Sequence, residues 1–429
     1  MYKPKWRLPV LGLVVLMVFA ACTGTASTPA PTSVPAEEEP TTAPTDAPAE
    51  PEMPTPVPTG DPSEPVVVTP PEEIGMCEAA PLPELPVRPV DDTDYVKGAS
   101  EADAEITIFE YSDFQCPGCA GMYPVLQTFL DDNPNVRLVY RHFPLDFHPY
   151  AMVTAEAVEA AGAQGKFWEM HDLLFDNAAI WSALTEDEVR ATMSAYAEDL
   201  GLDVEAFDEA LDNDTYVEKI QAQYDESISL GLPGTPTFIF NNVMFPSDIG
   251  LSYQGLAAFK SILESQDEIF FPDPPEISVA AEDDYEAVLS TSQGEIRIQL
   301  LAESAPVNVN SFVFLAGENW YDGSDFFFVR DGFVAVTGDP TNSTVGYPGY
   351  YCTGESQGVF DRAGLVGMLS NGQFFITLGA DAAQLNGQFA LVGQVTEGLD
   401  VLEKLARVTM GDPSAPQADV LESVEIVQN

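Results

Sequence analysis

The residues of this sequence best suited to chemistry are two cysteines, Cys116 and Cys119, separated by a proline and a glycine in "DFQCPGCA". Such a C-x-x-C pair can exchange disulfides, supply half of a metal site, or form a structural disulfide. A zinc site needs two further ligands, and His142, His148 and His171 are scattered without ligand spacing. We therefore expect no metal, and the neighbouring segments have to decide between redox chemistry and a structural role.

The segments around the cysteines predict a strand followed by a helix. Ahead of the pair, the alternation in "EITIFEYSDF" places Glu110 on one face of a strand. After it, "PGCAGMYPVLQTFLDDNP" predicts a helix with Pro117 in its first turn, where a missing N–H costs nothing. Cys116 then lies at the helix N-terminus, where the helix dipole favours a thiolate and can lower a thiol pKa from about 8.5 to roughly 3.5–7.5. We expect Cys116 to be the exposed attacking sulfur and Cys119 the shielded sulfur that resolves the mixed disulfide.

Residues 91–265 resemble the DsbA-like branch of the thioredoxin superfamily. The resemblance rests on "DFQCPGC", "VRLVYRHFPL", "AEAVEAAGAQGKFWEMHDLLF" and "LGLPGTPTFIFNN". It implies an α/β thioredoxin-like fold whose β-α-β front half is interrupted by a helical insertion before the last strands. Three helical patterns fit this insertion: residues around 148–177, a segment starting at a possible capping box Thr185…Glu188, and one from Asp203.

The resemblance also implies the roles of individual residues. Thr235 and Pro236 fall where the family carries its cis-proline loop beside the active cysteines, and the backbone of Thr235 would pair with an extended substrate. Pro117 and Gly118, between the cysteines, would belong to the same substrate-binding surface. Glu110 matches a buried acid that relays protons to the resolving cysteine, and the alternative is a surface carboxylate on an edge strand. Because Gly118 replaces the histidine of the most oxidising relatives, oxidase, isomerase and reductase activities all stay open.

Residues 285–429 begin with a strand, a turn, a second strand and then a helix behind Pro306, in "YEAVLSTSQGEIRIQLLAESAPVNVNSFVFLA". They resemble the cyclophilin-type peptidyl-prolyl isomerases over roughly residues 285–411. The likeness continues through "YDGSDF", "GFVAVTGDP", "GLVGML", "NGQFFIT" and "LNGQFALVGQVTEGLDVLEKL". It implies a second, all-β domain, a closed barrel with capping helices, which a linker at 266–284 would join to the first domain.

Several polar residues that the cyclophilin family uses for catalysis have no counterpart here. Family members place an arginine beside the substrate amide, where its hydrogen bonds lower a rotation barrier of about 18–20 kcal/mol. That position falls on Phe328, with Arg330 two residues further on. The family's glutamine, histidine and tryptophan positions fall on Val336, Phe389 and Gln384. The substrate-binding positions that survive are Phe333, Gln373, Phe375 and Leu385. Since one lost donor costs about 10²–10³ in rate, we expect a weak or inactive isomerase that binds clients, with an active isomerase as the alternative.

The N-terminal 22 residues have the features of an export signal. Three basic residues precede the short apolar run "PVLGLVVLMVFAA", which is too short to span a bilayer comfortably. The end of this run, "AAC", resembles a bacterial lipobox, which implies that Cys22 is lipidated; an ordinary secretory signal is the alternative. Either signal exports the chain to a compartment where disulfides persist. We expect an extracytoplasmic protein anchored to the cell membrane as a lipoprotein.

Residues 23–90 are rich in Pro, Thr, Ala and Glu and hold too little apolar surface to offset the entropy of folding. We expect them to form a disordered stalk. The whole chain has 69 acidic and 16 basic residues and a formal net charge of −53. This charge argues against nucleic-acid binding, which needs Lys and Arg for phosphate contacts, and against docking of the globular part on anionic lipid.

Five cysteines are present, and two of them have no role in the lipobox or the C-x-x-C pair. These are Cys77 and Cys352. Free thiols are a liability in an oxidising compartment, and two is the number that one bridge needs. We predict that they form a disulfide that ties the end of the stalk to the second domain, although each could instead be free or paired with another molecule.

The sequence as a whole predicts an envelope thiol–disulfide oxidoreductase that needs no cofactor. Its expected partners are exported clients that are unfolded or contain cysteines, and a membrane redox partner that recycles the cysteine pair. A cyclophilin-like module on the same chain fits this role, because disulfide formation and proline isomerisation are both slow folding steps. The alternatives are a foldase with both activities and a client-binding scaffold whose thioredoxin domain is structural.

Overall fold

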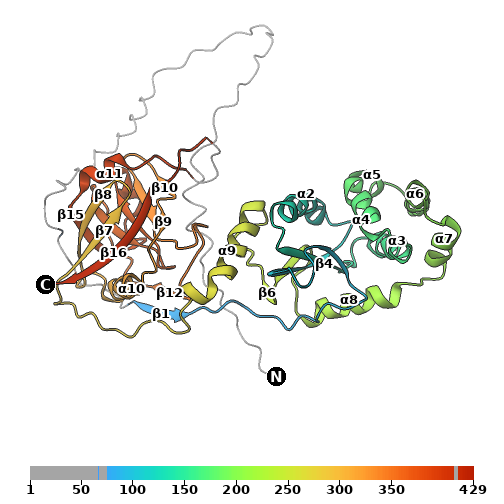
Figure 1. Cartoon of the computed structure of the whole chain (residues 1–429), viewed down its shortest axis with the longest axis horizontal. Coiled ribbons are helices and arrows are strands. Elements are labelled where there is room, and N and C mark those ends of the chain that lie inside the picture. Colours follow the sequence, from blue (N-terminus) through green and yellow to red (C-terminus); the bar gives the residue numbers. More distant parts are fainter. Residues whose placement is uncertain (1–65, 67–74, 410–413) are drawn as a thin grey trace, which may run out of the picture. The chain divides into compact units, whose positions relative to one another are not determined.

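The computed structural model describes residue 66, residues 75–409 and residues 414–429 (Figure 1). The predicted signal at 1–22, with Cys22, and nearly all of the stalk up to residue 74 lie outside the described residues. Within the described part, no helix combines the length and apolar character needed to cross a membrane.

The first domain is built on a five-stranded sheet in the order β2-β4-β3-β5-β6. The strands are β2 (Tyr95–Gly98), β3 (Ile106–Ser112), β4 (Val136–His142), β5 (Thr237–Phe240) and β6 (Val243–Met244). Strands β3 and β4 are parallel and the other pairs are antiparallel. Helices α2 (Pro117–Asp132) and α9 (Tyr253–Ile269) share one apolar core with this sheet. Residues of β3, β4 and β5 form a second core on the opposite face, next to Tyr224 of α8 (Val217–Ser229).

A helical insertion lies between β4 and β5, as predicted. Before α8 it contains α3 (Ala151–Ala163), α4 (Phe167–Asp176), α5 (Ala178–Trp181), α6 (Glu186–Asp199) and α7 (Val204–Asp212). The capping box is confirmed, since the backbone N–H of Thr185 donates to the Glu188 carboxylate over 2.9 Å. The start of α7 is also confirmed, because the Asp203 carboxylate accepts from the N–H of Ala206. The pattern at 148–177 is two helices rather than one, and Gly165 at φ +78° lies in the break between them.

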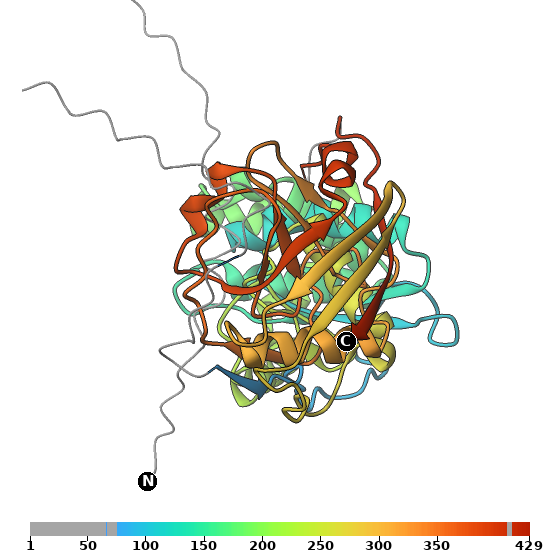
Figure 2. The same cartoon turned by 90° about the vertical axis from the view of Figure 1, so that its left-hand side faces the viewer.

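The second domain is a nine-stranded antiparallel sheet in the order β10-β11-β14-β13-β15-β8-β7-β16-β9. In Figure 2 its gold strands β7 and β8 run beside the red C-terminal strand β16. The strands are β7 (Tyr285–Thr291), β8 (Gly294–Leu300), β9 (Ser324–Asp325), β10 (Phe328–Val329), β11 (Val334–Thr337), β13 (Leu365–Met368), β14 (Phe374–Thr377), β15 (Ala390–Glu397) and β16 (Val420–Gln428). Helix α10 (Pro306–Gly317) begins at the predicted proline, and the 3₁₀ helix η1 (Ala380–Leu385) and α11 (Leu399–Lys404) complete the domain.

The prediction of a closed barrel is wrong in one respect. The sheet is a strongly curled half-barrel, because its edge strands β9 and β10 do not pair with each other. Their neighbouring backbone groups bond to loops instead: the N–H of Phe326 donates to the carbonyl of Asp419, and the N–H of Val329 to the carbonyl of Val408. These loop contacts supply hydrogen-bond partners to the backbone groups at the sheet edges, so the two edge strands need not pair with each other.

The segment from residue 75 to residue 90, expected as the end of a disordered stalk, is folded. Strand β1 (Met76–Ala79) pairs with β12 (Tyr350–Thr353) in a separate two-stranded sheet. Cys77 and Cys352 lie opposite each other in this pair and are joined by a disulfide. Val87 is buried in the core of the first domain. The average composition of residues 23–90 predicts disorder, although the few apolar residues at its end are enough to fold residues 75–90 against the two domains.

Candidate active site

Cys116 is the N-cap residue of α2, and Pro117 occupies the first turn as the sequence predicted. The strand β3 ends at Ser112, and the turn that follows delivers Cys116 to the helix start, where its N–H donates to the carbonyl of Asp113. The Cys116 thiol donates to the backbone carbonyl of Thr235 over 3.3 Å. The Thr235–Pro236 peptide bond is cis.

The two sulfur atoms lie in different electrostatic environments. A hydrogen bond from the Cys119 thiol, helped by the backbone N–H groups of Cys119 and Gly118, lowers the pKa of Cys116 to about 5, against the effect of burial. Cys119 is fully buried, and this burial, with the nearby Cys116 sulfur, raises its pKa far above the ordinary value. One sulfur is therefore a thiolate at neutral pH and the other a thiol.

Cys116 is less exposed than the sequence analysis expected. Only 7% of its surface is accessible, whereas the intervening Pro117 and Gly118 are exposed. The loop at Pro236 lies close to this turn: a Cβ atom on Gly118 would meet the Pro236 ring at 3.1 Å and the Cys116 sulfur at 3.6 Å. The absence of a side chain at Gly118 lets the loop approach this closely.

Glu110 lies on β3, in the middle of the five-stranded sheet, and is 2% exposed. The alternative of a surface carboxylate on an edge strand is therefore excluded. Burial raises the pKa of Glu110 to about 7, so this carboxyl can both accept and release a proton near neutral pH.

Further polar residues share the face of the sheet that carries Glu110, and the sequence analysis did not single them out. In the parallel β3–β4 pair, Glu110 lies opposite Tyr140 and Ser112 lies opposite His142. The Tyr140 and Ser112 hydroxyls are buried and have no hydrogen-bond partner among the described residues. Burial, with the nearby Glu110 and Cys119, raises the pKa of Tyr140 well above its usual value. These buried hydroxyls therefore lie on the same face as Glu110, and that of Tyr140 is near Cys119.

Two regions of the chain match known protein families. Residues 91–265 match the thioredoxin family, and residues 287–427 match the family described as cyclophilin type peptidyl-prolyl cis-trans isomerase/CLD. The chain joins a thioredoxin-type domain to a cyclophilin-type domain. The second match runs past residue 411, where the resemblance was expected to end, since β16 completes this sheet beside β7.

Individual relatives match only part of the chain. The Na(+)/H(+) antiporter NhaA 1 of Salinispora arenicola is 45% identical over 159 residues, which cover 37% of this chain and 22% of the antiporter. The chain thus spans less than a quarter of the length of this relative. Pseudomonas aeruginosa DsbA2 is 29% identical, with 34% of this chain and 79% of that chain covered and a TM-score of 0.28. A cyclophilin type peptidyl-prolyl cis-trans isomerase of Cryptosporidium parvum is 23% identical, with 34% and 99% covered and a TM-score of 0.30.

In the thioredoxin-type domain, Asp113 fixes the turn that carries Cys116. Its buried carboxylate accepts from the backbone N–H groups of Gln115 (2.8 Å) and Leu145 (2.9 Å) and lies 2.7 Å from Nδ1 of His148. This role of Asp113 and its contact with His148 were not predicted from the sequence. Leu145 and His148 lie 32 and 35 residues from Asp113, so the only local signal in "SDFQC" was the contact with Gln115 two residues away.

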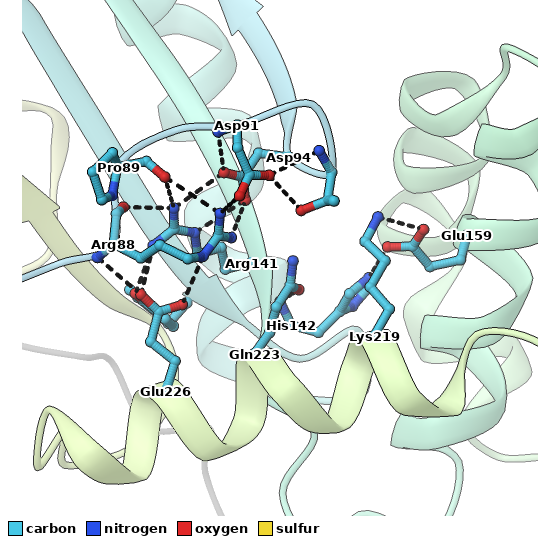
Figure 3. Close-up of polar contacts among 12 residues, drawn as sticks. Arg88, Pro89, Asp91, Asp94, Arg141, His142, Glu159, Lys219, Gln223 and Glu226 are labelled. Carbon is cyan, nitrogen blue, oxygen red and sulfur yellow. Dashed lines mark hydrogen bonds and ion pairs between the residues drawn. The ribbon is translucent and has the colours of Figure 1, made fainter.

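The opposite face of the same sheet carries a buried charge cluster around Arg141 (Figure 3). The guanidinium is inaccessible to solvent and pairs with Asp94 (3.1 Å) and Glu226 (2.8 Å), and it also donates to Tyr111 and to the carbonyl of Arg88. These contacts tie β4 to α8 and to the segment before β2. The cluster supports the sheet rather than the cysteine pair, because Arg141 points away from the face of Glu110.

The cyclophilin-type domain buries all four residues predicted to bind substrate. The exposed fractions are 3% for Phe333, 1% for Gln373, 2% for Phe375 and 9% for Leu385. The Gln373 amide donates to two backbone carbonyls, those of Thr344 and Gly346. The Phe375 ring is contacted by the rings of Phe360 and Phe389, with centroids 5.0 and 5.3 Å away. The expected groove is therefore filled by the domain's own side chains.

The structure also locates the residues at the family's polar catalytic positions. Phe328 is the register partner of Val336, and Val336 is the partner of Phe375, so these three apolar residues are neighbours across β10, β11 and β14. Arg330 is exposed in the turn after β10, with its guanidinium 4.1 Å above the Phe333 ring. No hydrogen-bond donor of the expected kind lies at the position of Phe328.

Proposed function

We propose that this protein is an envelope thiol–disulfide oxidoreductase that acts on exported proteins through Cys116 and Cys119. The observation that carries this proposal is the asymmetry of the pair. Cys116 has a pKa of about 5 beside the Thr235 carbonyl, whereas Cys119 is fully buried with a raised pKa. A structural disulfide or an inert core cysteine has no need of a low-pKa sulfur next to a peptide-pairing backbone.

The chemistry proposed is two successive thiol–disulfide exchanges. A client thiolate attacks the Cys116 sulfur of the oxidised pair, and Cys119 leaves and takes up the proton held by Glu110. A second client thiolate attacks the client sulfur of the mixed disulfide, and Cys116 leaves as a thiolate. Two electrons pass from the client dithiol to the pair, and a membrane redox partner would remove them. The Thr235 backbone, with Pro236, Pro117 and Gly118, would hold the extended client beside the sulfur.

The low pKa of Cys116 favours disulfide donation over reduction. At neutral pH it stabilises the dithiol form, which makes the disulfide form a stronger oxidant. A pKa of about 5 in place of 9 is worth on the order of 60 mV at pH 7. We therefore favour an oxidase or isomerase, and a measured potential near the value of about −270 mV of thioredoxin would contradict this direction.

The site of action proposed is the outer face of the cell membrane. The support is the export signal at 1–22 with Cys22 as the lipidated residue, and the Pro-rich segment that follows it as a stalk. The clients would be exported proteins that are unfolded or contain cysteines, with no nucleic acid, cofactor or metal involved.

The cyclophilin-type domain is proposed to be weak or inactive as an isomerase. The apolar trio of Phe328, Val336 and Phe375 and the burial of the four groove residues support this. Client binding in this groove would require Phe360 or Phe389 to move away from Phe375.

A trapping experiment separates the oxidoreductase from a client-binding scaffold. Replacing Cys119→Ser removes the resolving thiol, so mixed disulfides on Cys116 should accumulate in the envelope and disappear on reduction. The Cys116→Ser variant is the matched control and should trap nothing. A scaffold would give no mixed disulfides with Cys119→Ser and no thiol exchange with the unaltered protein.

A further inference from the structure

A small cavity lies within the thioredoxin-type domain, next to the face that carries Glu110. Its volume is about 10 Å³, close to the space that one water molecule needs. Glu110 of β3 and His171 of α4 line it, together with Lys97, Gln127 and Trp168. The cavity therefore places a buried carboxyl and a buried imidazole around room for a single water.

One ring nitrogen of His171, Nε2, has no hydrogen-bond partner among the described residues. The side chain is 4% exposed and packs against the rings of Phe114, Tyr140 and Phe175. Its Nδ1 lies 2.9 Å from the Asp172 carboxylate, whereas its Nε2 is buried without a partner among the described residues. A buried nitrogen without a hydrogen-bond partner destabilises the fold, so a water in the cavity would satisfy Nε2.

The path from His171 continues to the surface. Asp172 is 32% exposed, and its carboxylate lies 3.6 Å from the Lys97 ammonium and accepts from the Gln127 amide over 3.2 Å. The charged and titratable groups facing His171 from the packed elements are Asp172 on α4, Lys97 on β2, Tyr123 on α2, Glu110 on β3, and Tyr140 and His142 on β4. Of these, only Asp172 contacts the imidazole through a hydrogen bond in the described residues.

We propose that His171 relays protons between Glu110 and solvent through a water in this cavity. When Cys119 attacks the mixed disulfide, its proton passes to the Glu110 carboxylate. Glu110 then gives a proton to the water, which passes one to Nε2 of His171, and Nδ1 releases one toward Asp172 and solvent. No electrons move in this sequence, and it leaves His171 protonated at Nε2 instead of Nδ1. The reverse transfer restores the proton at Nδ1, when Cys119 leaves during oxidation of a client and takes its proton from Glu110. The inference rests on the proposed redox function, and it makes His171 a positioning residue that acts through Glu110.

The test follows one turnover of the full chain with glutathione disulfide as the probe. Attack by Cys116 forms the glutathione mixed disulfide, and attack by Cys119 releases it, so the two steps can be timed separately by mass spectrometry. In His171→Gln, which cannot relay a proton, the second step should slow by about 10²-fold. The loss should be largest below pH 7, where Glu110 starts protonated and has to release its proton first. The first step should be unchanged. Glu169→Gln removes an exposed titratable group of the same helix outside the cavity, where Glu169 pairs with Lys166, and should keep both rates and the pH profile.

A second variant guards against misfolding of the first. Asp172→Asn changes a partly exposed residue and leaves His171 in place. It should slow the same step, because the Asn amide can accept the hydrogen bond of Nδ1–H but cannot take up its proton. Release rates and pH profiles equal to those of the unaltered protein in either folded variant would overturn the relay. If the unaltered protein itself does not exchange with glutathione disulfide, the proposed redox function fails, and the relay fails with it.

Discussion

The thiol of Cys116 and the carbonyl oxygen of Thr235 are 3.3 Å apart, although the two residues are 119 positions apart in sequence. The reactive sulfur thus lies against the backbone that would pair with an extended client. A bound client would bring its own sulfur to this point only by lying along the loop of Thr235 and Pro236. Geometry at this loop, together with the pKa of the thiol, should therefore set the reactivity of the site.

The first prediction concerns the ionisation of Cys116. In the reduced protein, iodoacetamide should modify Cys116 with a midpoint near pH 5, because the thiolate is the nucleophile. Cys119 should stay unmodified at pH 7, since it is fully buried with a raised pKa. In Cys119→Ser the midpoint should move upward, because the thiol that stabilises the Cys116 thiolate most is gone. A midpoint near the ordinary value of about 8.5 in the unaltered protein would contradict the asymmetry of the pair.

The starts of several helices in the thioredoxin-type domain could be predicted from sequence because their causes are local. Pro117, Thr185 and Asp203 each act within one turn of the helix that they begin. The edge strands β9 and β10 do not pair with each other, because backbone groups beside them bond to Asp419 and Val408, about 80 to 90 residues away. Contacts this distant leave no local signal, so the sequence does not distinguish a closed barrel from a half-barrel.

The residues of the site that belong to a motif could be predicted, and those that packing brings together could not. The cysteine pair and the Thr235–Pro236 loop carry motifs, and Glu110 has a fixed spacing from Cys116. The neighbours Ser112, Tyr140 and His171 have no motif, because strand register and the packing of α4 alone bring them together. Their one signal in the sequence is a polar residue on the buried face of a strand or helix, which is visible only once the buried face is known.

The second prediction uses the buried carboxyl of Glu110. Its pKa is raised from 4.5 to about 7 in the folded protein, so folding favours the protonated form. The corresponding stability is fully present below about pH 4.5 and is lost as the pH rises through 7. In Glu110→Gln this loss cannot occur, so at pH 8 the variant should exceed the unaltered protein by on the order of 3 kcal/mol in unfolding free energy. Urea unfolding of both proteins at pH 4.5 and pH 8 measures the difference, which should shrink at the lower pH.

An equal gain at both pH values would show that Glu110 is not titrating and would contradict its role as proton acceptor. Glu105→Gln serves as the control. This residue lies just before β3, is exposed, and hydrogen-bonds the Asn135 amide, so its substitution should change stability little at either pH.

The third prediction concerns the charge cluster of Figure 3. Arg141→Met should destabilise the thioredoxin-type domain by about 3–5 kcal/mol, because the carboxylates of Asp94 and Glu226 would lose their fully buried partner and keep only the partly exposed Arg88. Arg190→Met is the matched control: its ion pair with Asp212 is exposed, so the loss should stay below about 1 kcal/mol. Denaturant unfolding followed by far-UV circular dichroism gives both values. Similar small losses in the two variants would mean that the cluster does not support the fold.

The fourth prediction is that the cyclophilin-type domain isomerises proline peptides poorly. Phe328 and Val336, which the sequence predicts at positions where the family carries hydrogen-bonding side chains, are register partners. Phe360 and Phe389 contact the ring of Phe375. Since removing one preorganised donor typically costs about 10²–10³ in rate, the full chain should fall at least about 10²-fold below an ordinary cyclophilin in a proline-peptide assay. Arg330 is exposed, and its guanidinium lies 4.1 Å above the ring of Phe333, a predicted groove residue. Within the described part of the chain, no other exposed arginine lies next to a predicted groove residue. Activity near that of an ordinary cyclophilin would contradict the prediction. If this activity disappears in Arg330→Ala but not in the control Arg407→Ala on the same domain, Arg330 replaces the missing arginine.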